Sequence, residues 1–579
     1  MYENTFNLEF LTNFLFGFVF ILISILFSIK ISKNVAIKKI FYFEEFQPLI
    51  IFFLIFSLYI LIFNLTTLIN YSLISELFFF IFFLKIIFIF KNLSEIKNIF
   101  RFNINLDEKI IFTIFSILFL ISILPLSDAD SISIYQYLPN VIFNEGLKDI
   151  NLQQNIEFTL LSNTEIILLI SSILKSDNFG SQLNLFTLFF FVILSLKDHK
   201  NFFLIVLSSP LIIYLISTQK LQLFFGILFL LLFIIVNKNL FFQKKNYLIF
   251  LLLLFFYSSG KLSYILLTIP LFIYFFYNHK ENWKIIILYS LCSFAIIYVP
   301  LLILKQIYFG NILSPFFDNI LGQNLDIYKA FTYSIRSSEG WLDNPEDLSL
   351  YLRPFISFEI SKLSSSLGLV FLLMLVNLKL QKETKFIPII LIILILVTGQ
   401  ILPRYYFEAF LLLAFFYKPQ QPVIKFFIYS QVLVIFLISI IYVYFGYIKF
   451  DVIKDKSRYM SQFSYSFYNA QQHKKDDLDA NTLDFSLDRH SIFFNKNLYS
   501  LRYLNILNNY NNQNDQNLTK FILDNSIKYL IVGSYKKIPK CLITDEIKET
   551  SRKKAVRNFL LKPKKNQYKI IEIKDNKCN

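Results

Sequence analysis

Long apolar runs separated by short polar segments fill the first 450 residues of the chain. The run from Ile51 to Phe63 contains no charged side chain and is much longer than a typical buried strand. A hydrocarbon core of about 30 Å requires roughly 20 mostly apolar residues in one helix. The pattern therefore predicts a mainly α-helical bundle with many membrane spans.

We expect about 14 spans. The apolar stretches lie at residues 10–29, 48–69, 72–90, 110–126, 183–196, 202–218, 221–236, 246–258, 262–277, 285–304, 366–378, 386–402, 405–417 and 425–447.

The charges in the short loops predict the orientation of these spans. Alternate short loops hold 20 Lys and Arg residues, whereas the opposite short loops hold only Lys220, Lys261 and Arg404. Positive charge collects on the cytoplasmic side of membrane proteins, so these three residues are predicted to face outward. Two long loops, residues 127–182 and 305–365, and the segment 451–579 follow on the same outer side.

Composition excludes several classes of protein. With 56% apolar and 17% charged residues, the chain is too apolar for a soluble protein. Its net charge of +16 follows the membrane loops rather than a basic stripe with interleaved aromatics, so we expect no nucleic-acid partner. Three Cys and four His residues, separated by the predicted topology, provide neither an iron–sulfur site nor a histidine metal site.

The last 129 residues differ from the rest, because they hold 38 of the 96 charged residues. Apolar patterning predicts a helix at 519–525 and strands at 527–532 and 568–573, which together indicate a small α/β domain over 451–579. We expect this domain to rest as a cap over the active cavity and to guide acceptors, with no catalytic residue of its own. An oxidising outer compartment would allow a disulfide between Cys541 and Cys578; two free thiols are the alternative.

The first outer loop carries the most suggestive chemistry. Asp128 and Asp130 follow a predicted span directly, and helical spacing then predicts an amphipathic helix that ends at Gly146. We expect Ser131 or Asp130 to cap this helix, and a second interfacial helix at 164–174. A carboxylate here could take a proton from an acceptor hydroxyl. The alternative is that both acids only cap the helix and solvate the loop.

The same stretch resembles the first external loop of GT-C glycosyltransferases related to the protein mannosyltransferase and aminoarabinose transferase families. Four further segments, at 165, 259–264, 309–316 and 402–406, are similar to positions in that family. The resemblance covers about 110–450, the predicted catalytic body, and makes residues 1–109 an N-terminal addition. The chain departs from the family at Gln136, where relatives often have His, and at Ile312, where they have Pro.

The resemblance implies an enzyme that moves a sugar from a polyprenyl-phosphate donor to an acceptor hydroxyl, with inversion. Its site would face the periplasm or exterior of a bacterial inner (plasma) membrane. In this interpretation Asp128 or Asp130 is the base, and Glu165 orients the acceptor or a metal ion. A lipid-linked donor also fits an outward site, because nucleotide sugars stay in the cytoplasm.

The leaving phosphate needs cations, and the three outward cations are the candidates: Arg404, Lys261 and Lys220. Snorkelling to lipid headgroups is the alternative for each. Tyr135, Arg336 and Trp341 are candidate sugar or acceptor contacts, with solvated loop residues as the alternative. No cofactor is certain, and a divalent metal ion at Asp128 or Asp130 stays open. The expected partners are membrane lipids, the lipid-linked donor and a glycan, lipid or protein acceptor.

Two other functions stay open. A transporter or flippase for a lipid-linked glycan would also have many spans, but it would need a polar central pathway. A polymerase or ligase of lipid-linked glycans would rely on paired arginines in large outer loops, for which Arg336 and Arg353 are available.

The predicted orientation can be tested by cysteine labelling. In a chain whose native cysteines are replaced, Asp128→Cys should react with a membrane-impermeant thiol reagent added outside intact cells. Lys97→Cys, on a predicted cytoplasmic loop, should react only after permeabilisation. Labelling of Asp128→Cys only from the cell interior would reverse the topology.

Overall fold

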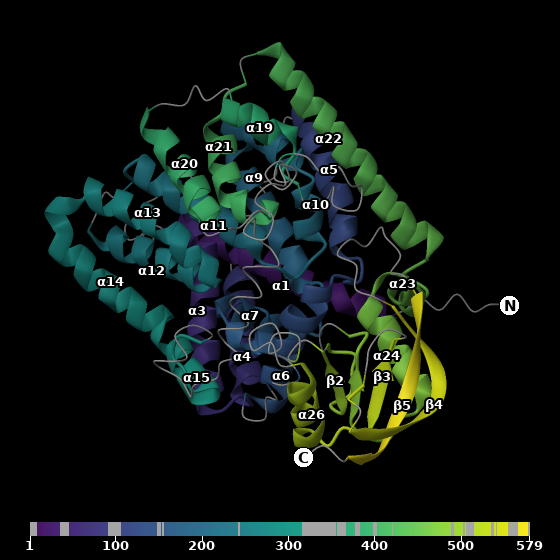
Figure 1. The fold of residues 1–579 in the computed structure, drawn as a ribbon. Coiled ribbons are helices and arrows are strands. Elements are labelled where there is room, and N and C mark those ends of the chain that lie inside the picture. The colour runs from purple at the N-terminus through teal and green to yellow at the C-terminus, as the bar shows by residue number, and fades with distance from the viewer. Residues whose placement is uncertain are drawn as a thin grey trace.

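The computed structural model describes residues 8–34, 46–90, 106–147, 152, 154, 156–240, 244–314, 355, 366–376, 382–397, 402–419, 421–487, 491–501, 504, 514–533, 538–539, 541–553 and 565–576. These residues are mainly helical with one small sheet, which confirms the predicted class. Figure 1 shows the helices packed together in one body, with the sheet at one end.

The helices of the body have the following bounds: α1 Leu8–Lys33, α3 Gln47–Ile69, α4 Leu73–Phe90, α5 Leu106–Ser122, η3 Ser131–Gln136, α6 Tyr137–Glu145, η4 Ile156–Leu160, α7 Asn163–Ile167, α8 Leu169–Ile173, α9 Phe179–Leu207, α10 Leu211–Ile216, α11 Gln222–Asn237, α12 Lys245–Ser259, α13 Leu262–Asn278, η5 Lys280–Asn282, α14 Trp283–Ile297, α15 Val299–Phe309, α19 Leu369–Val376, α20 Lys382–Val397, η8 Pro403–Tyr406, α21 Phe407–Phe416, α22 Pro422–Val443 and η9 Tyr444–Lys449.

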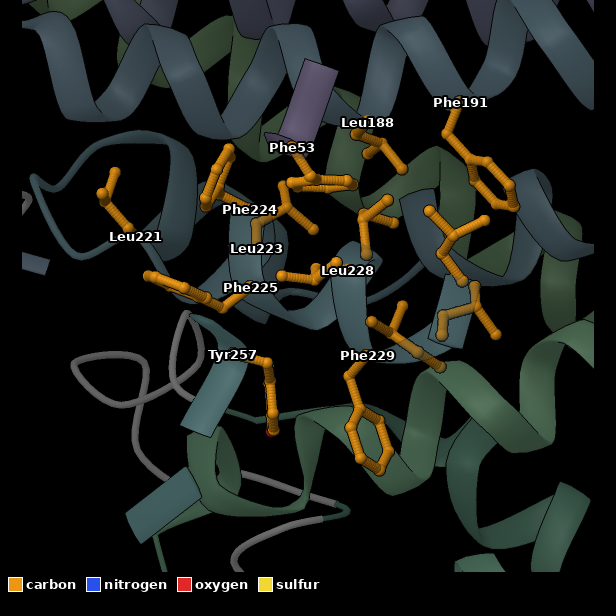
Figure 2. Packing of buried hydrophobic residues seen from close by; sticks show 14 of the residues in the cluster. Phe53, Leu188, Phe191, Leu221, Leu223, Phe224, Phe225, Leu228, Phe229 and Tyr257 are labelled. Atoms are coloured by element: carbon orange, nitrogen blue, oxygen red, sulfur yellow. The ribbon is translucent and has the colours of Figure 1, made fainter. Parts of the chain in front are cut away.

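Helix α11 forms the centre of this body. All of its residues from Gln222 to Val236 are buried, as expected for a helix that is apolar on every side. It packs against α9, α12 and α21. Figure 2 shows Phe224, Phe225 and Phe229 of α11 within this packing, with Phe53 and Tyr257 from neighbouring helices.

Four of the described helices are long and apolar enough to cross a membrane, and a fifth candidate is the bent pair α13 and α14. The four are Phe10–Lys33, Gln47–Ile69, Phe179–Leu196 and Pro422–Lys449. Several other predicted spans, including α11 and α12, are apolar helices of only 10–17 residues. These two helices have almost the predicted bounds, 221–236 and 246–258, but each is shorter than the roughly 20 residues that a span requires.

One residue from each of the two predicted sets of loops can be placed along α11. At its start, the Gln222 side-chain amide donates to the backbone carbonyl of Arg404, from the predicted outer set. Just beyond its end, the Lys238 ammonium, from the predicted inner set, lies 5.5 Å from the ring centroid of Phe46. Arg404, from the predicted outer set, and Lys238, from the predicted inner set, are therefore about the length of α11 apart.

The first outer loop contains the predicted amphipathic helix as η3 and α6. It ends at Gly146, whose φ of 70° is a conformation that glycine adopts readily. The second predicted helix is different, because the structure divides it into α7 and α8. Almost all of its side chains are buried, and α7 packs against α3 and α12. It is therefore covered by protein instead of lying open at an interface.

The C-terminal domain contains helices α23 Lys456–Phe463, α24 Tyr465–Asp476 and α26 Asn514–Asp524, and strands β1 Thr482–Asp484, β2 Leu498–Ser500, β3 Tyr529–Val532, β4 Leu542–Lys553 and β5 Lys565–Asn576. The sheet order is β2-β1-β3-β5-β4. Strands β2, β1 and β3 are parallel, whereas β5 pairs antiparallel with β3 and β4. The predicted helix and both predicted strands are confirmed as α26, β3 and β5.

This domain packs on the first outer loop. Ile132 of that loop and Leu124 share an apolar cluster with residues of the domain that include Val452 and Tyr459. Ala129, the residue between the two acids, packs against a second cluster of the domain. The Lys496 ammonium also lies 2.9 Å from a carboxylate oxygen of Glu145. The acidic segment is therefore held between the helical body and the C-terminal domain.

A buried ion cluster joins three elements inside the C-terminal domain. Arg552 of β4 is fully buried, and its guanidinium contacts Asp484 at 2.8 Å and Asp476 at 2.6 Å. Asp484 lies on β1 and Asp476 ends α24. A single arginine thus pairs with two carboxylates and ties the edge strand β4 to the rest of the domain.

Arg552→Met should therefore destabilise the C-terminal domain strongly, because it leaves two buried carboxylates without their cation. We expect a loss of about 3–5 kcal/mol, measured by denaturant titration of the full chain with proteolytic susceptibility of the domain as readout. Lys528→Met, which removes a surface contact to Glu572, is the matched control and should leave the transition in place. An unchanged midpoint for Arg552→Met would contradict this role.

Candidate functional site

Asp128 anchors the start of the first outer loop. Its carboxylate oxygen Oδ2 accepts hydrogen bonds from the Ser131 backbone N–H at 3.0 Å and from the Ser131 hydroxyl at 3.1 Å. We expected Ser131 or Asp130 to cap this helix. The capping acceptor is instead the Asp128 carboxylate, and Asp130 makes no side-chain capping bond. The loop places both carboxylates beside the turn that precedes α11.

Lys220 lies between the two acids. Its ammonium nitrogen is 2.7 Å from Asp130 Oδ2 and 3.4 Å from Asp128 Oδ2. The lysine side chain is only 8% exposed, so water does little to screen these contacts. Residues that are distant in sequence therefore form one partly buried charge cluster, as the predicted orientation of both loops led us to expect.

The electrostatics of Lys220 follow from this geometry. Burial alone would lower the pKa of Lys220, but the carboxylates of Asp128 and Asp130 raise it above its ordinary value. The Lys220 ammonium also donates to the hydroxyl of Tyr214 and lies 4.8 Å from the centroid of that ring. Lys220 is accordingly a stable cation throughout the physiological pH range.

Arg404 approaches the same cluster from another part of the chain. It lies in the short helix η8, after Pro403, and its Nη1 is 3.9 Å from Asp130 Oδ2. Its backbone carbonyl accepts a hydrogen bond from Gln222, the first residue of α11. The start of α11 therefore fixes Arg404 and Lys220 relative to each other.

Lys261 is the third predicted cation, and it reaches Tyr405 instead of an acid. Its ammonium nitrogen lies 4.7 Å from the Tyr405 ring centroid, and the Arg404 guanidinium carbon lies 5.3 Å from the same centroid. A ring face attracts cations. Tyr405 thus brings Lys261 close to Arg404, and the structure gathers all three cations that were predicted to face outward.

Tyr135, a predicted sugar contact, is within the electrostatic range of this cluster. Burial raises the pKa of Tyr135; the carboxylates of Glu165 and Asp130 raise it further, while Lys220 and Arg404 oppose them. Its phenol therefore stays protonated and can donate a hydrogen bond.

Glu165 caps the start of α7, which contacts the residue before Lys261. Its Oε2 accepts from the Ser162 backbone N–H at 2.7 Å and lies 2.5 Å from the Ser162 hydroxyl, which completes a capping box at α7. Burial raises the pKa of Glu165, and the bonds from Ser162 oppose that rise. The hydroxyls of Ser162 and Thr164 lie 2.8 Å and 2.5 Å from the carbonyl of Gly260, the residue before Lys261.

Gly260 is also fixed sterically. A Cβ atom at this position would lie 2.6 Å from the ring of Phe225 on α11. The Gly260 backbone is thus held on one side by α7 and on the other by α11. The structure shows Glu165 in a capping box at the start of α7. Its role in orienting an acceptor or a metal ion stays a prediction.

Arg336 and Trp341 are outside the described residues. Cys541 is disulfide-bonded and Cys292 is free; Cys578, the predicted partner of Cys541, is outside the described residues. Cys541 directly precedes Leu542, which pairs with Asn576 on β5.

The two acids do not make a good divalent-metal site. Within the described residues, no group of three or more His, Cys, Asp and Glu side chains is placed to hold a metal ion. The space between Asp128 and Asp130 is instead bridged by the Lys220 ammonium, whereas Mg²⁺ and Ca²⁺ favour several oxygen ligands.

Sequence reasoning missed Tyr214 and Gln219. Tyr214 lies six residues before Lys220 inside an apolar run, where a tyrosine is easily taken for a core residue. Gln219 directly precedes Lys220, and its backbone N–H donates to the Ser131 hydroxyl at 3.0 Å. An uncharged polar pair, Thr218 and Gln219, beside an isolated lysine was the available signal.

Comparison with protein-family models, curated proteins and solved structures finds no match for this chain.

The charge cluster predicts a clear double-mutant result. Lys220→Met should cost about 1–3 kcal/mol in stability, because two partly buried carboxylates lose the cation between them while Arg404 remains 3.9 Å from Asp130. Adding Asp130→Asn should recover part of this loss, since it removes one of those charges. Thermal unfolding of the purified variants measures both effects.

Because the Lys220 pKa is raised, its contribution to stability is present below its ordinary pKa and is lost only as the pH rises through the folded value. The deficit of Lys220→Met should therefore be constant between about pH 6 and pH 9. Equal stability of Lys220→Met and the parent chain would contradict a structural charge cluster.

Proposed function

We propose that this chain is a membrane glycosyltransferase that moves a sugar from a polyprenyl-phosphate donor to an acceptor hydroxyl, with inversion. The observation that supports the proposal best is the contact of Asp130 with Lys220 at 2.7 Å and with Arg404 at 3.9 Å. This arrangement places a carboxylate, the group that can accept a proton, beside cations that can bind a phosphate.

The proposed reaction uses both halves of the cluster. Asp128 or Asp130 takes the proton of the acceptor hydroxyl, and the acceptor oxygen forms a bond to the anomeric carbon of the donor sugar. The bond from that carbon to the phosphate oxygen breaks, and polyprenyl phosphate leaves with the electron pair. Lys220 and Arg404 stabilise the charge that develops on the leaving phosphate.

Donor binding also makes the carboxylate available. Without donor, Asp130 is the anion that Lys220 and Arg404 contact. The donor phosphate competes for these cations, and its binding weakens their hold on Asp130. Asp130 can then accept the proton of the acceptor hydroxyl only after the donor has bound.

A lipid-linked donor suits the surroundings of the cluster. Lys220 and Arg404 lie at the start of α11, within a body of apolar helices. A prenyl chain can reach such a site from the bilayer while its phosphate meets the cations. A GT-C-like body with about 14 spans, in a bacterial inner membrane with the site on the outer side, belongs to this proposal.

Replacing both acids tests the proposal. Asp128→Asn with Asp130→Asn should lower transfer at least 100-fold, because no carboxylate remains to accept the proton. The measurement is release of prenyl phosphate from a panel of prenyl-linked sugars by the purified protein. Asp107→Asn, which alters a surface contact to Lys200, is the matched control and should retain activity.

Retained transfer in the double variant would exclude the base assignment. Movement of an intact lipid-linked glycan across vesicles, without release of prenyl phosphate, would instead indicate a transporter or flippase. Lengthening of one lipid-linked glycan by another would indicate a polymerase or ligase.

A further inference from the structure

Asp177 connects the C-terminal domain to the charge cluster. Its carboxylate oxygen Oδ2 lies 3.1 Å from the ammonium of Lys456, the first residue of α23. Its backbone carbonyl accepts hydrogen bonds from the side-chain amides of Gln219 and of Gln136, the latter at 3.3 Å. One residue therefore contacts the domain through its side chain and the site through its backbone.

Gln219 continues this connection to the acids. Its backbone N–H donates to the Ser131 hydroxyl at 3.0 Å, and that hydroxyl donates to Asp128 Oδ2 at 3.1 Å. Its side-chain oxygen accepts the backbone N–H of Gly180 at 2.5 Å. Gln219 is fully buried, and its backbone N–H, side-chain oxygen and side-chain amide group each make a hydrogen bond that holds the residue before Lys220.

The start of α9 packs closely against the turn that carries Lys220. A Cβ atom at Gly180 would lie 2.8 Å from the backbone oxygen of Gln219. Asn184, one turn later, donates to the backbone carbonyl of Lys220 at 2.6 Å. The turn that carries Lys220 is therefore set by its neighbours as well as by its own ion pairs.

We infer that Gln219 is a positioning residue that fixes Lys220 against the acidic pair, and that the Lys456–Asp177 contact couples this position to docking of the C-terminal domain. The domain thereby takes part in forming the site. Only the expected effect on turnover rests on the proposed function; the coupling itself is a property of the hydrogen-bond network.

The coupling can be separated from stability. The side chains of Lys456 and Asp177 are 21% and 42% exposed, and partly exposed ion pairs contribute at most about 1 kcal/mol. Removing the contact should therefore leave the fold intact. A displacement of reacting groups by about 1 Å can nevertheless lower a rate by about 100-fold.

Hydrogen exchange gives a test that needs no activity. Lys456→Met should speed amide exchange at least about threefold in peptides covering residues 128–136 and 176–184, and in the turn 217–222. Lys454→Met, two residues away and paired with Asp451 at 3.2 Å, is the matched control and should not change these peptides. Unchanged exchange in Lys456→Met, with the domain folded, would overturn the coupling.

Exchanging the charges of Asp177 and Lys456 tests whether the ion pair itself keeps amide exchange slow. Asp177→Lys combined with Lys456→Asp restores an ion pair at the same place and leaves the backbone carbonyl of residue 177 in use. Exchange should return to the parent rate in the double variant but not in either single variant. Fast exchange that persists in the double variant would contradict a role for the ion pair.

Turnover distinguishes failure of this inference from failure of the proposed function. Lys456→Met should lower kcat about tenfold with donor KM within twofold, and Lys456→Arg should retain activity. If the parent chain transfers no sugar, the proposed function fails while the exchange data still decide the coupling. If the parent is active and Lys456→Met retains both kcat and slow exchange, the inference fails alone.

Discussion

Lys220 is an ammonium group in a place where water reaches little of it, and such a charge is tolerated only beside opposite charge. Its two carboxylates come from one loop, and the guanidinium near Asp130 comes from another. Meeting this requirement brings residues 128–131, 217–222 and 402–406 to the start of α11. The arrangement of the outer end of the helical body follows from neutralising that one cation.

Amide side chains donate hydrogen bonds to backbone carbonyl groups in the same region. Helix ends leave carbonyl groups without partners, and an apolar body offers no water to satisfy them. Asn178 donates to the carbonyls of Ser122 and Leu124, at the end of α5. Asn184 donates to the carbonyls of Leu215 and Lys220. The start of α9 thus holds both loops that carry the charge cluster.

The sequence was sufficient to predict the meeting of acids and cations, because only three positive residues remain in the short outer loops. It also predicted α26, β3 and β5 from apolar spacing. It could not predict that Tyr214 contacts Lys220 or that Gln219 contacts Ser131 and Asp177, since these contacts depend on how the chain folds around the cluster. The division of predicted spans into shorter helices was missed for another reason: hydropathy averages over breaks, such as the one between α9 and α10.

The residues that meet around Asp128 and Lys220 are far apart along the chain. The Gln219–Ser131 contact spans 88 residues, and the Lys456–Asp177 contact spans 279. A ribosome therefore delivers both carboxylates well before the cation that neutralises them. In that interval the two acids lack their cation, so they stay charged only where water reaches them and take up protons where it does not. The charge cluster is complete only after residue 404 has been made, and its contact to the C-terminal domain only after residue 456.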